Sequence, residues 1–122
     1  MARDPAVMPR FVLLEHTGHP DDPAGRHYDL LLEEPEACRT WRLAEIPVAG
    51  GEPVAATPLP PHRLAWLEIG AGEVSGGRGF ARRVDAGTYA PAAGGEVRLS
   101  GARLGGRLRF EPAEIGWRAV LD

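Results

Sequence analysis

Glycine and proline are spread along almost the whole chain, and this spacing limits the fold more than any other feature of the sequence. The 122 residues include 16 Gly and 12 Pro. Both residue types disfavour the interior of a helix, so a long uninterrupted helix is not expected. Short apolar segments lie between the turn-forming residues instead, which is typical of an all-β fold. We predict a small antiparallel β-barrel of about eight short strands with little helix.

The predicted strands fill a single domain. A chain of this length fits one compact domain, which we place at residues 10–122 after a flexible leader at residues 1–9. Strands are expected at residues 10–16, 27–33, 38–43, 63–69, 78–84, 96–99, 107–110 and 116–121. Five prolines occur between residues 47 and 61. Because proline cannot donate a hydrogen bond within a sheet, this segment is expected to form an extended surface loop.

Several protein classes are excluded by what the chain lacks. No apolar run approaches the ~20 residues of a membrane span, and the N-terminus lacks the basic-then-apolar order of a signal peptide. We therefore expect a cytoplasmic protein that does not contact membranes. The single cysteine, Cys38, cannot form an internal disulfide or a thiolate cluster, so any metal must be held by His and carboxylates. The chain has no lysine, so phosphate must be bound by Arg or His.

Charge is distributed unevenly along the chain. Residues 11–61 contain nine acidic side chains and three Arg, whereas residues 62–110 contain eight Arg and four acidic side chains. An acidic half that holds a cation beside a basic half that holds phosphate would suit a metal-dependent phosphoesterase. The alternative is that these are solvated surface charges that merely differ by region.

Two histidines and one aspartate are candidates for a metal site. His27 and Asp29 share one face of a predicted strand, roughly 7 Å apart along it, while the leucines at 30 and 32 take the other face. His16 ends the preceding strand and supplies a third ligand if the two strands pair. Two imidazoles and one carboxylate suit Mn²⁺, Fe²⁺ or Zn²⁺. On spacing alone, a hydrogen-bonded surface pair is the competing interpretation.

A set of motifs, in order along the chain, resembles a known family. They read FVLLEH at residues 11–16, HYDLLLE at 27–33, RTW at 39–41, HRLAWLEI at 62–69, SGGRG at 75–79 and DAGTY at 85–89. Their order and content are similar to those of the 3′-phosphoesterase domain of bacterial DNA ligase D. The resemblance spans roughly residues 10–120 and is more specific than any one of the motifs.

The resemblance implies a fold, an activity and a set of site residues. Members of that family are small β-barrel enzymes that use a divalent metal, typically Mn²⁺, to remove 3′-phosphates and 3′-ribonucleotides from DNA ends. Carried over by motif, His16, His27 and Asp29 occupy the metal-ligand positions, with Zn²⁺ or another divalent ion as the alternative to Mn²⁺. His62 falls at the catalytic histidine that contacts the phosphate. The implied partners are the 3′ ends of primer-template DNA and a DNA ligase or polymerase.

The sequence departs from the family pattern at several positions. Leu31 replaces an arginine two residues after the strand aspartate, which removes a bidentate phosphate donor. Trp66 replaces a tyrosine, and Glu45 stands near the position of a lysine. The loop between the first two histidines is longer and carries His19, Asp21 and Asp22.

Two arginines near a glycine-rich turn are candidates for the missing phosphate contacts. Arg78 and Arg82 are four residues apart, so they face the same side of a regular strand, whereas Arg83 faces the other. Glycines at 76, 77 and 79 would let a phosphate approach the backbone closely. A β-turn with solvated arginines is the alternative interpretation.

Three functional hypotheses follow. The first is a metal-dependent 3′-end phosphoesterase in DNA repair. The second, favoured by Leu31, is a noncatalytic β-barrel module that binds nucleic-acid ends or a repair protein. The third is a phosphoesterase that acts on small nucleotides, since an acidic, short chain offers little surface for duplex DNA.

Overall fold

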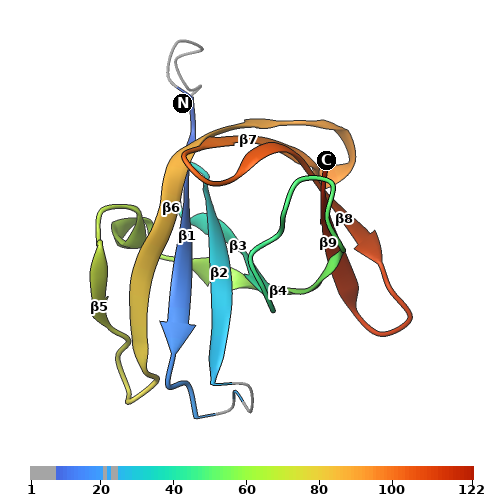
Figure 1. The fold of residues 1–122 in the computed structure, drawn as a ribbon. Helices are drawn as coiled ribbons and strands as arrows, with labels where there is room; N and C mark the ends of the chain where they lie inside the picture. The colour runs from blue at the N-terminus through green and yellow to red at the C-terminus, as the bar shows by residue number, and fades with distance from the viewer. Residues whose placement is uncertain (1–7, 21, 23–24) are drawn as a thin grey trace.

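The computed structural model of the protein describes residues 8–20, 22 and 25–122. Within these residues the chain forms nine strands and two short 3₁₀ helices (Figure 1). The strands are β1 (Arg10–Thr17), β2 (Arg26–Glu33), β3 (Cys38–Leu43), β4 (Val54–His62), β5 (Ala71–Glu73), β6 (Phe80–Pro91), β7 (Val97–Gly101), β8 (Gly105–Pro112) and β9 (Trp117–Leu121). The helices are η1 (Leu64–Leu67) and η2 (Ala93–Gly95). None of the described helices is long and apolar enough to cross a membrane.

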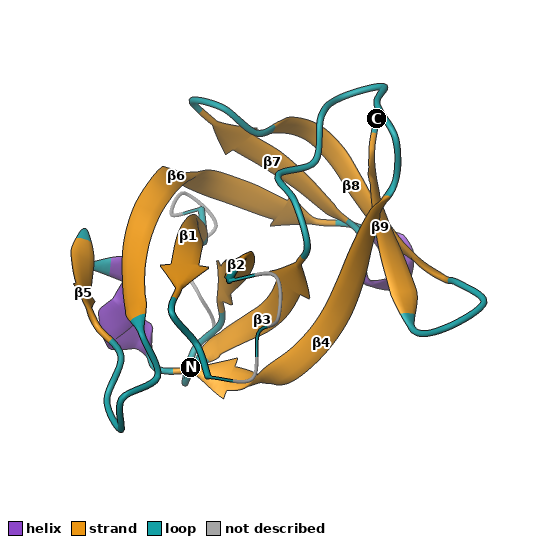
Figure 2. Cartoon of the chain, turned by 60° about the horizontal axis from the view of Figure 1, so that its bottom comes forward, coloured by secondary structure: helices purple, strands orange, loops and turns teal. Residues whose placement is uncertain are grey.

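Eight of the strands close into an antiparallel barrel, which confirms the predicted fold class. Their order is β1-β2-β3-β4-β9-β8-β7-β6, and β6 pairs with β1 to complete the ring (Figure 2). The ninth strand, β5, pairs with the N-terminal end of β6 and lies outside the ring. The pairing of β1 with β6 is irregular between Leu13 and Leu14. Such an irregularity bends the strand and helps a small sheet to close.

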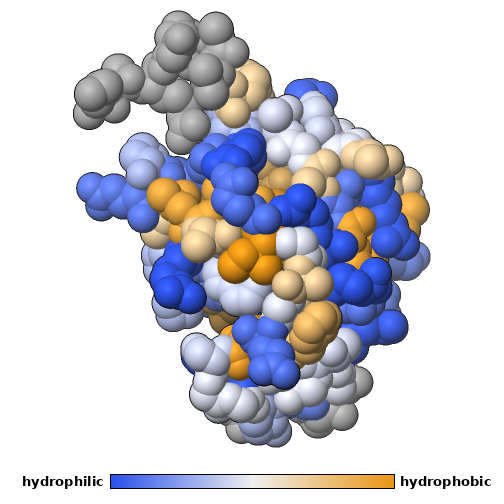
Figure 3. Space-filling model, turned by 90° about the vertical axis from the view of Figure 1, so that its left-hand side faces the viewer, coloured by the Kyte–Doolittle hydropathy of each residue, from blue (hydrophilic) through white to orange (hydrophobic). Residues whose placement is uncertain are grey.

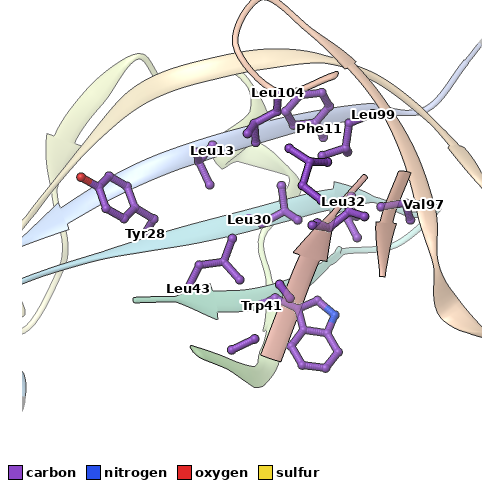
Figure 4. Close-up of a cluster of buried hydrophobic side chains, with 14 of the residues drawn as sticks. Phe11, Leu13, Tyr28, Leu30, Leu32, Trp41, Leu43, Val97, Leu99 and Leu104 are labelled. Carbon is purple, nitrogen blue, oxygen red and sulfur yellow. The ribbon is translucent and has the colours of Figure 1, made fainter. Parts of the chain in front are cut away.

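The barrel interior holds the main hydrophobic core. Successive side chains on a strand point to opposite faces, so alternate residues of each strand enter the barrel. β1 contributes Phe11 and Leu13, while β2 contributes Tyr28, Leu30 and Leu32, all of them buried. Figure 4 shows these side chains converging with those of β3 and β7 and with Leu104. The polar residues that alternate with them on β2 therefore project from the outer face of the barrel.

A second apolar cluster covers part of that outer face. Val12, Leu14 and Leu31 project outward from β1 and β2 and pack against Leu67 of η1. The two strands are thus buried on both faces, as their continuous apolar runs indicate. Cys38 belongs to this cluster, and burial raises the pKa of its thiol to about 11, which keeps it protonated at neutral pH.

The proline-rich segment departs from the prediction, because part of the expected loop at 47–61 is strand β4. Pro58, Pro60 and Pro61 lie within it. β4 pairs with β3 along most of its length, but with β9 only from Val54 to Ala56. Beyond Ala56 it is therefore an edge strand, where proline is tolerated because no partner needs its missing N–H.

The segment 63–69 also departs from the prediction, because it contains the helix η1 instead of a strand. Its apolar side chains Leu64 and Leu67 are three residues apart and both pack on the second cluster, which matches the period of a 3₁₀ helix. β6 is longer than expected, and β5 was not predicted. Of the leader predicted at residues 1–9, only Met8 and Pro9 lie within the described residues.

Candidate metal centre

The three predicted metal ligands lie together on the outer face of the β1–β2 hairpin. His16 of β1 stands directly opposite His27 of β2, and Asp29 follows two residues later on the same face. One ligand atom from each residue lies within 4.8 Å of the others, and all three side chains are buried. The strand alternation seen in the sequence therefore brings these groups together as expected.

The spacing of the donor atoms fits a single divalent ion. His16 Nδ1 lies 3.1 Å from His27 Nε2 and 3.6 Å from Asp29 Oδ2, and His27 Nε2 lies 3.7 Å from Asp29 Oδ1. An ion with ligands at roughly 2.0–2.2 Å places neighbouring donors roughly 3.0–3.5 Å apart. The site thus matches a first coordination shell that needs only small adjustments.

Hydrogen bonds on the far side of each ring fix which nitrogen faces the site. His16 Nε2 donates to the carbonyl of Arg78 at 2.6 Å, and His27 Nδ1 donates to Asp22 Oδ2 at 2.9 Å. In the neutral rings, the two nitrogens that face each other are then both lone-pair acceptors. A proton or a metal ion is needed between them. Asp29 Oδ1 is likewise buried and accepts no hydrogen bond from the described residues.

The charges around His27 and Asp29 favour a bound cation. Burial lowers the pKa of His27, but the carboxylates of Asp29 and Asp22 beside the ring outweigh that effect and raise the pKa above its ordinary value. Burial raises the pKa of Asp29, yet His27 and Arg42 act against it and the net change is downward. Asp29 is therefore ionised at neutral pH, and two carboxylates contact the imidazole of His27. Two nitrogens and one carboxylate oxygen suit Mn²⁺, Fe²⁺ or Zn²⁺ and leave coordination positions for water and substrate.

Asp22 holds the ring of His27 with Nε2 toward His16, which gives a first prediction. Asp22→Asn is expected to weaken Mn²⁺ binding ~10–100-fold, because a neutral amide is a weaker acceptor for the Nδ1–H. Titration of free Mn²⁺ by electron paramagnetic resonance measures the affinity. Glu52→Gln removes the same charge from an exposed position and should bind Mn²⁺ as the unmodified protein does. Equal affinities for Asp22→Asn and Glu52→Gln would contradict this role.

Two of the candidate ligands, His16 and Asp29, line an open cleft of about 560 Å³. One wall is formed by the end of β4 and by η1, and the other by β5 and the turn that follows it. His62, at the end of β4, lines the cleft and donates from Nδ1 to the carbonyl of Pro60, which leaves Nε2 to contact a ligand. Asp29 lines the same cleft.

The surface around the cleft combines apolar and charged groups. Leu59, Pro60 and Trp66 line it together with three arginines, at positions 42, 63 and 78. Figure 3 shows the face on the β5 side, where separate apolar patches lie among hydrophilic side chains. An apolar wall with a few cations suits a ligand that has a planar or apolar part and an anionic group.

The structure separates the two arginines that the sequence placed on one face. Arg78 lines the cleft and donates to the carbonyl and hydroxyl of Ser75. Arg82 lies on the opposite face of β6 and forms an ion pair with Glu15. The expectation that they face the same way was wrong because β6 begins only at Phe80, so Arg78 belongs to the preceding turn.

Sequence reasoning missed two residues that line the cleft near the ligands. Arg42 is the cross-strand neighbour of Asp29, a relation that depends on the β2–β3 register. His19 lies beside His16, with ring centroids 5.5 Å apart, and was noted only as part of a longer loop. Asp21, from the same loop, lies outside the described residues.

No protein-family model matches the chain, and the curated proteins give no significant match. The likeness to the ligase D phosphoesterase therefore remains an interpretation of the motifs.

Proposed function

We propose that the protein is a metal-dependent phosphoesterase that removes 3′-phosphates or 3′-ribonucleotides from DNA ends. The observation that carries this proposal is the His16, His27 and Asp29 cluster at the edge of a cleft that also holds His62 and arginines. A metal ion with open positions beside a cationic cleft is suited to a phosphate ester. Mn²⁺ is the proposed ion, with Zn²⁺ or another divalent ion as the alternative.

The residues of the cleft have distinct proposed roles. His16, His27 and Asp29 hold the ion, which when bound polarises a phosphate oxygen and activates water. His62 contacts the phosphate and donates a hydrogen bond or a proton to it or to the leaving oxygen. Arg78 supplies positive charge at the cleft wall. Trp66 and the neighbouring prolines give an apolar surface for the sugar or base.

The product of such a reaction is a 3′-hydroxyl end. A DNA ligase or polymerase requires that end, so we propose that one of these enzymes acts after this protein in the cytoplasm. The 3′ end of a primer-template is the proposed DNA partner.

An end-processing assay tests the activity. A labelled primer-template with a 3′-phosphate, a second with a 3′-ribonucleotide and a third with a 5′-phosphate are incubated with the protein and Mn²⁺. We expect conversion of the first two, protection of the third, and loss of activity when EDTA removes the metal. A free 3′-mononucleotide tests the small-nucleotide alternative, which gains support if it is cleaved faster than the primer.

The noncatalytic module remains a second candidate because of Leu31. This residue is fully buried in the second apolar cluster, so no guanidinium stands at that point of the sheet. Tight binding of the 3′-phosphate primer with no turnover under Mn²⁺, Zn²⁺ or Mg²⁺ would support this candidate over the enzyme.

A further inference from the structure

One arginine on the floor of the cleft has an unusual environment. Arg42 projects from β3 on the same face as Asp29, and its Nε lies 3.7 Å from Asp29 Oδ1. That distance is too long for a hydrogen bond, and Nε is buried without a partner among the described residues. About one third of the side chain is exposed, and it lines the cleft.

The position of this arginine is costly unless a ligand uses it. A buried N–H without an acceptor loses its hydration and gains nothing in return. A positive charge beside the candidate ligand Asp29 also opposes the binding of a metal ion there. An anion bound beside the ion and in contact with the guanidinium would offset both costs. A guanidinium can donate two parallel hydrogen bonds to the oxygens of one phosphate.

The other arginines near the cleft are less suited to this role. Arg78 is held by Ser75, and Arg83 donates to the carbonyls of Leu67 and Ile69. Arg63 is exposed at the start of η1, and Arg82 faces away from the cleft. Arg42 alone among these five is the strand neighbour of a candidate metal ligand.

We infer that Arg42 binds the phosphoryl group of the substrate and makes phosphate and metal bind cooperatively. This inference rests on the proposed function for its substrate class, an anionic phosphate ester. With an ion held by the cluster, the charge of Asp29 would be shared, and the guanidinium of Arg42 would be available to the anion. Coupling of this kind is reciprocal, so phosphate should tighten metal binding by the same factor by which metal tightens phosphate binding.

The experiment measures inorganic phosphate and Mn²⁺ binding separately, by isothermal titration calorimetry on the full chain. For Arg42→Gln we expect phosphate affinity of the Mn²⁺-loaded protein to fall about 10- to 100-fold, the loss of one charge-assisted contact. Mn²⁺ affinity without phosphate should be unchanged or higher, since a neighbouring cation has been removed. Arg42→Lys keeps the positive charge but cannot form a bidentate contact. Its phosphate affinity should lie between those of Arg42→Gln and the unmodified protein.

Arg98→Gln is the matched control, because it removes an exposed arginine from β7 outside the cleft. It should bind both ligands as the unmodified protein does. The inference is overturned if Arg42→Gln binds phosphate within about threefold of the control, or if it loses Mn²⁺ binding. The second result would mean that Arg42 merely supports Asp29. Circular dichroism confirms that each variant is folded.

The two proposals can fail independently. Phosphate binding that depends on Arg42, in a protein that leaves 3′-phosphate DNA intact, supports the anion site and refutes the proposed activity. Cleavage of that DNA, together with normal phosphate binding by Arg42→Gln, supports the activity and refutes the anion site.

Discussion

His27→Ala is expected to remove most of the bound Mn²⁺. The substitution deletes one of three protein ligands from a buried site and leaves His16 and Asp29 without the third donor. Loss of an outer hydrogen-bond partner alone weakens metal binding ~10–100-fold, so loss of a ligand should cost more than ~100-fold. Metal analysis after gel filtration, followed by a Mn²⁺ titration, measures the effect.

His27→Gln provides a second variant that keeps an uncharged polar group and more of the side-chain volume. Both variants should show the strand-dominated circular dichroism of the unmodified protein, because the ring lies outside the barrel core. Mn²⁺ affinity unchanged in a folded His27→Ala protein would show that the cluster is not a metal site.

His62→Ala is expected to reduce turnover of the 3′-phosphate primer by ~10² to 10⁴ while metal content stays unchanged. His62 lines the cleft but is not one of the three clustered ligands, so its role is separable from metal binding. The comparison of kcat for the two proteins, with the Mn²⁺ content of each, measures both parts of the prediction.

His62→Gln distinguishes two roles of the ring. A side-chain amide can donate a hydrogen bond to phosphate but cannot transfer a proton at neutral pH. Activity restored by His62→Gln indicates hydrogen bonding, and activity as low as in His62→Ala indicates proton transfer. Normal turnover in His62→Ala would exclude His62 from the reaction, and loss of Mn²⁺ would instead make it a metal ligand.

The hairpin that carries the metal cluster could be predicted because its information is local. The alternation of His27 and Asp29 with apolar residues determines which face each side chain takes. His16 is then the cross-strand partner of His27 once β1 and β2 pair, and consecutive strands of a chain commonly pair with each other.

The walls of the cleft could not be predicted because they depend on pairings that are distant in sequence. Pro58 is compatible with a strand because no described residue pairs with β4 on its other side at that point. Likewise, the side of the sheet on which Arg82 lies depends on where β6 begins and on its register with β1. The neighbours of Asp29 on β3 also follow from register, which a strand pattern alone does not determine.

Leu31 illustrates how a family comparison can mislead at a single position. In the sequence it stands out as a missing arginine, yet in the structure it fills the contact between the sheet and η1. A guanidinium at this fully buried position would lose hydration without a partner and would destabilise the protein. The substitution Leu31→Arg therefore does not simply add a phosphate ligand to the existing site.

The location of the three ligands on one hairpin has a consequence for folding. His16, His27 and Asp29 are close in sequence, whereas β1 meets its other partner, β6, only about seventy residues later. Closing a long loop is slower and costs more chain entropy than forming a hairpin. The three side chains can therefore come together before the barrel closes, whereas the cleft wall that follows β5 joins them only when β6 pairs with β1.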